Sequence, residues 1–228
     1  MPSLEAEIAR VPMFRRLAAD DRERLAGLAR LLPMARGQVL FREGDPSLHL
    51  YLVVAGRIKV VKSTSSGRDL ILDLFGPGDP VGAVAVFEGV PFPAAAIALA
   101  ESTCLAIERD AFLGLLDHNP TLVRGLLSGF SLRLMELTAR LSDLTGARVE
   151  ARLARAILSL AEGESERKPE GLFVPVRLSR QELADLCGTT IETAIRVMSR
   201  WGKEGIVRTE SEGFQLLDAE ALADIAQV

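Results

Sequence analysis

One stretch of the sequence, residues 179–207, combines polar side chains with a spacing suited to reading DNA. It predicts two short helices joined by a turn at Gly188, since glycine tolerates backbone angles that other residues avoid. Ser179 and Glu182 have the S-x-x-E spacing of a capping box and predict the start of the first helix. The inner face of that helix is small and apolar, at Leu183, Ala184 and Cys187.

The second helix carries the side chains that could contact base pairs. Thr189 or Thr190 can cap it, and Glu192 lies in its first turn. Its inward positions are Ala194, Val197 and Met198. Its outer face holds Thr190, Ile191, Glu192, Ile195, Arg196 and Arg200. A glycine turn followed by a polar, Arg-bearing helix is the geometry of a helix-turn-helix that reads DNA, and the alternative is an ordinary helical hairpin with a solvated charged side.

Several neighbouring elements must position this pair of helices. Residues 149–161 predict an amphipathic helix, residues 162–171 a polar loop, and residues 172–179 a strand. After the pair, residues 206–210 and 213–217 predict a β-hairpin wing, and a short helix closes the chain.

A long helix precedes this region and carries a heptad seam. Its apolar residues are spaced 4-3-4-3-4-3, at Val123, Leu127, Phe130, Leu134, Leu137, Leu141 and Leu144. This spacing favours a two-stranded coiled coil and therefore a homodimer, with packing of the stripe on the rest of the chain as the alternative. Thr145 and Gly146 interrupt the seam and predict a hinge between domains.

The first half of the chain has a different texture. Residues 3–30 look helical, with an apolar stripe at Leu17, Leu25, Leu28 and Leu31. Short β-rich runs then alternate with turn residues, at 39–41, 49–55, 57–62, 70–75, 95–100 and 103–108. Such closely spaced short strands predict a small antiparallel barrel or roll, and residues 110–118 predict a capped helix after it.

The bulk properties fit a globular DNA-binding protein. The chain has 228 residues and a net charge of −4, but six basic residues stand against four acidic ones between Arg177 and Arg208. This local field is what attracts phosphate. The charged start and the lack of a long apolar run predict a cytoplasmic protein that does not enter a membrane. No catalytic triad, metal-ligand cluster or P-loop is found, so an enzyme is not expected.

Segments on both sides of the seam carry a family resemblance: two lie before it in the chain, and the predicted helix-turn-helix lies after it. With the reader itself, RGQVLFREGDPSLHLYLVVAGRIKV (36–60) and GDPVGAVAVFEG (78–89) resemble the cyclic-AMP receptor protein / fumarate-and-nitrate regulator superfamily of transcription regulators. The resemblance implies an α+β fold: an N-terminal antiparallel β-roll, cyclic-nucleotide-binding-like, over 1–120, a dimerisation helix over 121–146, and a C-terminal winged helix-turn-helix over 147–228.

The resemblance also implies how DNA is read. Glu192 and Arg196 match the family's base-reading Glu and Arg, which suit a G·C pair, while Ile191 and Ile195 depart from the family pattern and could contact a thymine methyl. The groups expected on the DNA backbone are Ser179, Arg180, Gln181, Thr190, Thr193 and Arg200. The implied partners are a second copy of the chain, double-stranded DNA with a palindromic operator, and RNA polymerase.

The sensor side departs from cyclic-AMP-binding members of the family. Those members place a Gly-Glu pair and an Arg-Ser pair around the ligand, whereas this chain has Gly82 followed by Ala83 and the sequence FPAA at 92–95. No cationic side chain occurs between Gly78 and Glu108. A buried phosphate without a partner costs several kcal/mol, so cyclic AMP is not expected there. The effector-pocket candidates are Gly82, Ala83, Val84, Pro93, Ala94, Ala95, Leu137 and Thr138.

The identity of an effector stays open at this point. The apolar cassette could hold a hydrophobic small molecule, or its own side chains could fill it. No cofactor or metal is predicted, and haem stays open. Its axial candidates are His49, His118, Cys104, Cys187, the methionines and the N-terminus, although the histidines are interpreted as surface or capping residues and the cysteines as core residues. The alternatives to a DNA-binding regulator are a cyclic-nucleotide-type regulatory module and a haem- or redox-responsive sensor of the same architecture.

Overall fold

The computed structural model describes residues 4–10, 14, 17–63, 69–146 and 148–227. Two compact units divide the chain, Met1–Leu134 and Met135–Val228. The long helix α5 (Pro120–Gly146) includes residues of both. It coincides with the helix predicted from the heptad seam and ends at Gly146, where the seam was expected to break. The domain boundaries given above stay predictions.

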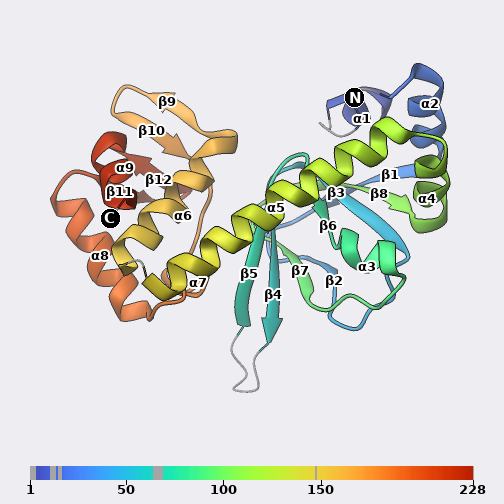
Figure 1. Ribbon diagram of the computed structural model, residues 1–228. Helices are drawn as coiled ribbons and strands as arrows, with labels where there is room; N and C mark the ends of the chain where they lie inside the picture. Colours follow the sequence, from blue (N-terminus) through green and yellow to red (C-terminus); the bar gives the residue numbers. More distant parts are fainter. Residues whose placement is uncertain (1–3, 11–13, 15–16, 64–68, 147, 228) are drawn as a thin grey trace. The chain divides into compact units, whose positions relative to one another are not determined.

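The first unit contains two four-stranded antiparallel sheets, which confirms the predicted β-roll (Figure 1). One sheet has the order β1 (Ala29–Met34), β8 (Ser102–Glu108), β3 (His49–Ala55) and β6 (Pro80–Val81). The other has the order β2 (Val39–Phe41), β7 (Ala95–Ala98), β4 (Ile58–Ser63) and β5 (Asp69–Phe75). All six predicted strands are present, while β1 and β6 were not predicted.

Alternating apolar residues in these strands form the core of the roll. Tyr51 pairs with Ala106, and Leu52 pairs with Leu105, across β3 and β8. Leu50, Leu52 and Leu105 are fully buried, as expected for side chains on the inner face of a sheet. Helices α3 (Ala83–Glu88) and α4 (Arg109–Asp117) add Val86 and Phe112 to the same cluster.

The N-terminal segment differs from the single helical stretch predicted for residues 3–30. It forms α1 (Leu4–Arg10) and α2 (Ala19–Leu28), and the chain then enters β1. Leu31 consequently lies on a strand, opposite Leu105, rather than on a helical stripe with Leu25. Hydrogen bonds with β8 favour the strand conformation here. If residues 29–34 were helical, the backbone N–H and C=O groups along this side of β8 would lose their partners. Pro33 is compatible with β1 because the strand is at the sheet edge.

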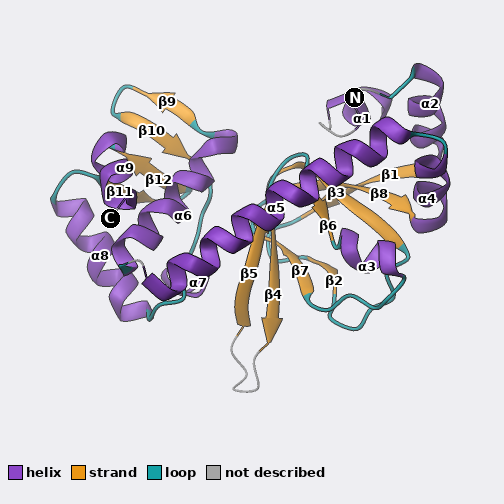
Figure 2. Ribbon diagram, in the orientation of Figure 1, coloured by secondary structure: helices purple, strands orange, loops and turns teal. Residues whose placement is uncertain are grey.

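The second unit is a winged helix-turn-helix (Figure 2). Its helices are α6 (Val149–Glu164), α7 (Arg180–Leu186), α8 (Ile191–Lys203) and α9 (Ala219–Gln227). Its sheet has the order β11 (Val207–Glu210), β12 (Gly213–Leu216), β10 (Gly171–Val174) and β9 (Glu166–Lys168). The wing and the closing helix are confirmed. The prediction of a polar loop over residues 162–171 is partly wrong, since strand β9 lies within it. This segment forms a strand because it pairs with β10.

The local signals of the helix pair are also confirmed. Ser179 and Glu182 form a complete capping box at the start of α7. Thr190 caps α8 by accepting a hydrogen bond from the Thr193 backbone. The predicted inner faces of both helices are buried, and Trp201, the single tryptophan of the chain, is fully buried beside them.

Candidate nucleic-acid interface

The outer face of α8 presents two charged side chains that make no hydrogen bond or ion pair with the residues the structure describes. Glu192 and Arg196 are exposed and one helical turn apart, so they project from the same side of the helix. Within the described part of the chain, neither side chain makes a hydrogen bond or an ion pair. A free carboxylate and a free guanidinium at this spacing can accept from cytosine N4 and donate to guanine O6 and N7.

The two isoleucines on this helix differ in accessibility. Ile195 lies between the charged pair and is 45% exposed, an unusual fraction for a large aliphatic side chain. Ile191, at the first position of α8, is half-buried. The exposed apolar surface that could meet a thymine methyl therefore belongs mainly to Ile195.

The residues predicted to contact the DNA backbone are all engaged within the chain. Ser179 Oγ accepts from the Glu182 backbone N–H at 3.1 Å, and Gln181 Nε2 donates to Asp185 Oδ1 at 2.7 Å. Thr190 and Thr193 bond to each other across the first turn of α8. These groups shape the helix ends, so any phosphate contact would be made in addition to, or in exchange for, an existing bond.

Arg180 joins the first helix of the pair to the wing. Its Nη2 donates to Thr209 Oγ1 on β11 at 2.6 Å. The side chain is partly buried, and desolvation lowers the pKa of its guanidinium. Arg180 therefore positions the wing relative to α7 in addition to the phosphate role expected of it.

Arg200 is paired with Glu150 on α6. Its Nη2 lies 2.8 Å from Glu150 Oε2, and its Nε lies 3.7 Å from Glu204 Oε1. The hydrogen bond from Arg200 lowers the pKa of the Glu150 carboxyl, and the charges of Arg148 and Arg196 act in the same direction. The same bond raises the pKa of Arg200. Sequence reasoning missed Glu150, because it lies fifty residues before Arg200 and no local pattern joins them.

Helix α5 presents apolar side chains on more than one face. Leu122 and Leu126 are buried in the roll, and Phe130 packs edge-on against Phe87 with ring centroids 5.9 Å apart. Of the predicted seam, Leu127 is 60% exposed and Leu134 is 67% exposed, with Val123 and Leu137 also exposed. The side chains of Leu141 and Leu144 lie outside the described part. Among the described seam residues of the first unit, Phe130 thus packs on the roll, whereas Val123, Leu127 and Leu134 stay exposed.

Aromatic rings occupy the interior of the predicted effector cassette. Phe41 and Phe92 are buried and stack with centroids 3.7 Å apart, and Tyr51 lies 5.8 Å from Phe41. Gly82 has a φ of 72°, which favours glycine, and a Cβ added there would lie 2.5 Å from Phe92 Cε1. The two side chains that stack on each other thus also lie close against the backbone at Gly82.

The remaining pocket candidates divide between buried and exposed positions. Ala83 and Ala94 are buried, Ala95 is half-buried, and Val84 and Pro93 face outward. Leu137 and Thr138 are exposed residues of the second unit, so their predicted contribution to the cassette stays a prediction. The structure therefore gathers only the members from 82 to 95 into one region of the roll.

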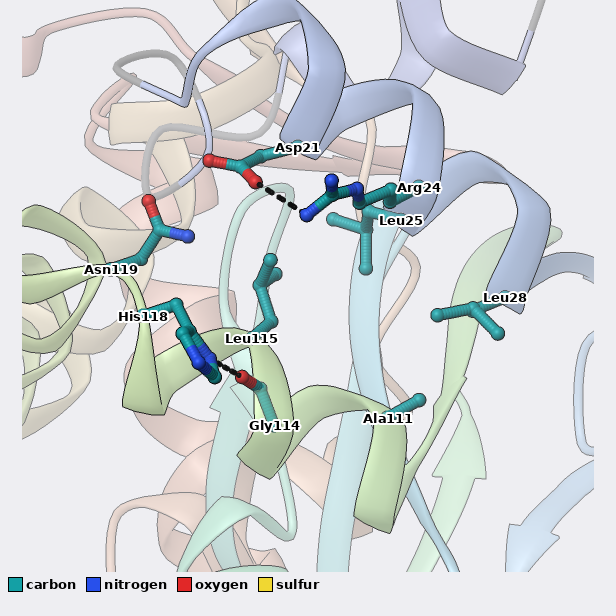
Figure 3. Close-up of a pocket in the computed structure, with 9 residues that line it drawn as sticks. All are labelled: Asp21, Arg24, Leu25, Leu28, Ala111, Gly114, Leu115, His118 and Asn119. Atoms are coloured by element: carbon teal, nitrogen blue, oxygen red, sulfur yellow. Dashed lines mark hydrogen bonds and ion pairs between the residues drawn. The ribbon is translucent and has the colours of Figure 1, made fainter.

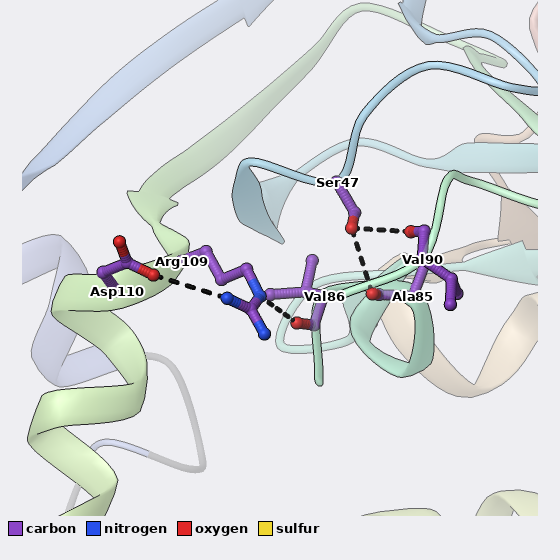
Figure 4. Close-up of polar contacts among 6 residues, drawn as sticks. All are labelled: Ser47, Ala85, Val86, Val90, Arg109 and Asp110. Carbon is purple, nitrogen blue, oxygen red and sulfur yellow. Dashed lines mark hydrogen bonds and ion pairs between the residues drawn. The ribbon is translucent and has the colours of Figure 1, made fainter. Parts of the chain in front are cut away.

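Two cations from outside the 78–108 segment reach the cassette, a feature that sequence reasoning missed. Lys62 on β4 donates to the Pro93 carbonyl at 2.8 Å and to Glu43 Oε1 at 2.9 Å. Arg109 Nε donates to the Val86 carbonyl at 2.7 Å, while Ser47 Oγ donates to the Ala85 and Val90 carbonyls (Figure 4). Both cations and the serine are thus committed to the cassette's own backbone.

The haem and redox candidates occupy structural positions. His118 is the C-cap of α4, with Nδ1 3.0 Å from the Gly114 carbonyl, beside a hollow between α2 and α4 (Figure 3). Cys104 and Cys187 are buried, and burial raises the pKa of the Cys104 thiol to about 12. The capping interpretation of His118 and the core interpretation of the cysteines are confirmed.

Neither a metal cluster nor a membrane helix is found in the described residues. No three His, Cys, Asp or Glu side chains come together there as a metal site. No helix among them has the length and apolar character needed to span a bilayer.

Comparison with known families matches both halves of the chain. The family model described as cyclic nucleotide-binding domain matches residues 31–119, and the model described as Crp-like helix-turn-helix domain matches residues 151–225. A CRP-like cAMP-activated global transcriptional regulator from Mycobacterium tuberculosis is 29% identical over 188 residues, covering 82% of this chain and 84% of that protein. A cyclic AMP receptor protein from Thermus thermophilus is 28% identical over 215 residues, covering 94% and 96%.

Solved structures agree with these relatives. A CRP-family transcriptional regulator from Thermus thermophilus superposes with a TM-score of 0.75 at 27% identity, covering 86% of this chain and 97% of that one. The c-di-GMP responsive global regulator CLP from Xanthomonas campestris gives a TM-score of 0.74 at 26% identity, covering 88% and 100%. With the nucleotide-binding-type roll, the long helix and the winged reader in the same order, the chain belongs to the CRP/FNR superfamily of transcription regulators.

Proposed function

We propose that the protein acts as a homodimer on a palindromic DNA operator and that cyclic AMP is not its effector. The observation that carries the proposal is the pair Glu192 and Arg196, exposed on α8 and unpaired among the described residues. In a dimer, the two recognition helices would enter successive major grooves about 34 Å apart. The resulting operator would have two-fold symmetry, with a G·C pair in each half-site.

The apolar residues of α5 support the homodimer. Leu127 and Leu134 are exposed in the single chain and follow the seven-residue spacing of a coiled coil. Exposed apolar surface of this kind marks an interaction site on soluble proteins, and a two-fold partner would cover it with the same residues.

The filled cassette supports a signal other than cyclic AMP. Phe41 and Phe92 occupy its interior, and Lys62 is held by Glu43, so accepting a cyclic phosphate would require both breaking an ion pair and moving packed rings. Two of the relatives named above are described as cAMP-activated or as a cyclic AMP receptor, and a third as c-di-GMP responsive, so the shared fold does not determine the ligand. The effector would be a different small molecule, or the dimer would bind DNA without one.

Selection from random double-stranded DNA tests the operator proposal. The full chain, without added nucleotide, is expected to enrich a palindrome at moderate salt, and gel shift should then give a lower Kd for that sequence than for a scrambled one. Failure to enrich any palindrome would refute the proposal.

Sedimentation tests the dimer. The wild-type chain is expected to sediment at twice the monomer mass, and Leu134→Glu should shift it toward monomer because a charge would enter the seam. Leu70 is exposed on β5, so Leu70→Glu is the control and should leave the sedimentation mass of the dimer unchanged. A wild-type chain that is monomeric at micromolar concentration would contradict the proposal.

Calorimetry and spectroscopy test the effector. Titration with cyclic AMP should release no heat of binding, and micromolar affinity would overturn the assignment. An absorbance spectrum and a mass spectrum of protein purified from its own host test the alternative of a haem-responsive sensor, since a retained haem would give an intense absorption band.

A further inference from the structure

The C-terminal end of α7 is closed by a specific arrangement of backbone bonds. Gly188 has a φ of 57°, and its N–H donates to the Asp185 carbonyl at 3.3 Å. The Thr189 N–H donates to the Ala184 carbonyl at 2.9 Å. These two bonds make a Schellman motif, which satisfies carbonyls within the helix. The carbonyls of Cys187 and Gly188, at the turn itself, are not used by it.

Arg152 on α6 supplies the donors for these two carbonyls. Its Nε donates to Cys187 O at 3.0 Å, and its Nη2 donates to Gly188 O at 3.3 Å. In return, Cys187 Sγ donates to the Arg152 carbonyl at 3.7 Å. A cation is favourable at this position because the C-terminus of a helix carries partial negative charge. The planar guanidinium reaches both carbonyls at once, which a single ammonium group cannot do with fixed geometry.

This contact lies next to the start of the recognition helix. Only Thr189 separates Gly188 from Thr190, the N-cap of α8. A bond that holds the turn against α6 therefore also bears on the N-terminal end of the helix that carries Glu192 and Arg196. A second contact to α6, the ion pair of Arg200 with Glu150, lies near the other end of the helix.

We propose that Arg152 is a positioning residue for DNA recognition, acting through the Cys187–Gly188 turn on the direction in which α8 presents its base-reading side chains. The proposal rests on the proposed function, because it assigns Arg152 a role in specificity without direct contact with DNA. Its physical content is that loss of the guanidinium releases the turn, so that α8 samples orientations that still attract phosphate but no longer match base edges.

Arg155 offers a matched control on the same helix. Its Nε donates to the Ala226 carbonyl of α9 at 2.7 Å. Like Arg152, it is thus a partly buried arginine of α6 that donates to a backbone carbonyl of another segment. This bond leads to α9 and not to the turn before α8. Truncation of either arginine removes a charge and at least one hydrogen bond to a backbone carbonyl from the same unit, but only Arg152→Ala removes the bonds to Cys187 and Gly188.

The first measurement is the ratio of the Kd for a scrambled duplex to the Kd for the selected operator. Arg152→Ala should lower this ratio by about tenfold, Arg152→Lys by less, and Arg155→Ala by no more than about twofold, as expected for coupling through packed contacts. Thermal unfolding verifies that the variants are folded at the temperature of the assay. Equal losses for Arg152→Ala and Arg155→Ala would overturn the proposal, since the effect would then be general destabilisation.

The second measurement does not depend on DNA. Hydrogen exchange of peptides covering 185–193 should be roughly five- to tenfold faster in Arg152→Ala than in wild type, and unchanged in Arg155→Ala. If the wild-type chain selects no operator, the proposed function fails while this exchange result still decides whether Arg152 holds the turn. Unchanged exchange in Arg152→Ala would refute the positioning role directly.

Discussion

The effector cassette and the recognition helix use their side chains in opposite ways. In the cassette, Phe41 stacks on Phe92, and Lys62 pairs with Glu43. On α8, Glu192 and Arg196 stand exposed with no such partner in the described part of the protein. In the cassette these side chains bond or pack with one another, whereas the recognition helix leaves two charged side chains available to a ligand.

The difference shows how two parts of one protein can be tested separately. A substitution in the cassette should change stability, because its groups are packed and bonded to one another. A substitution of the free pair on α8 should change DNA binding and leave stability nearly unaltered, because exposed groups without partners contribute little to folding. Two variants test this division, and two more test polar groups of the second unit that are already bonded within the chain.

Phe92→Ala should have the largest effect. Removal of a buried, stacked ring costs about 3–5 kcal/mol of folding free energy through lost transfer energy and a residual cavity. Urea denaturation measures the change. Val84→Ala, at an outward-facing position of the same cassette, should stay within about 0.5 kcal/mol of wild type. A loss below about 1 kcal/mol for Phe92→Ala would mean that the rings do not fill the cassette tightly.

Arg196→Ala should weaken operator binding by about 1–3 kcal/mol and relax the preference at one base position in each half-site. The reason is the loss of a bidentate contact to guanine. Gel shifts with a set of single-base operator variants measure both effects, and Lys203→Ala, in the last turn of the same helix, serves as the control. A uniform loss across all sequences would instead identify Arg196 as a phosphate contact.

Thr190→Ala should lower the stability of the reader by about 1 kcal/mol, because its hydroxyl caps α8. Fluorescence of Trp201, fully buried in α8, reports the unfolding of this unit in urea. Thr189→Ala, one residue earlier and outside the cap, is the matched control. Equal effects of the two substitutions would show that the hydroxyl of Thr190 is not the cap.

Glu150→Gln should have the smallest effect and should depend on pH. The pKa of Glu150 is lowered in the folded protein, so its pairing with Arg200 stabilises the fold fully above about pH 4.5 and is lost as pH falls through the lowered pKa. Both side chains are more than a third exposed, and solvent screening limits the contribution to about 0.5 kcal/mol. Melting curves should separate wild type from variant at pH 7 and converge near pH 3; a constant difference would contradict the ion-pair account.

Local sequence signals predicted most of the helices and strands. The capping box at Ser179, the glycine turn at Gly188 and the cap at Thr190 act within a few residues, so their spacing is sufficient to place α7 and α8. The N-terminal stretch was predicted less well. Leu31 belongs to a strand because β8, more than seventy residues later, forms hydrogen bonds with this segment. No pattern among the residues near Leu31 indicates that pairing.

The candidate site was predicted in part for the same reason. The outer face of α8 follows from helical periodicity, so the sequence alone predicts that Glu192 and Arg196 lie side by side on it. Lys62 beside Pro93 and Arg152 beside Cys187 could not, because each pair is joined only by the folding of distant segments. The stacking of Phe41 on Phe92 could likewise not be read from the sequence, which left the interior of the apolar cassette open.

The sequence by itself determined most of the helices and strands, with β1, β6 and β9 as exceptions, and which side chains the recognition helix turns outward. These features depend on periodicities and caps that act over a few residues. The tertiary structure alone decided which of those polar groups are already bonded within the chain. It left Glu192 and Arg196 unpaired among the described residues, engaged Arg180 with Thr209 and Arg200 with Glu150, and closed the turn before α8 with Arg152. The physical reason is that a hydrogen bond requires two groups to meet, and meeting across distant segments is a property of the packed chain.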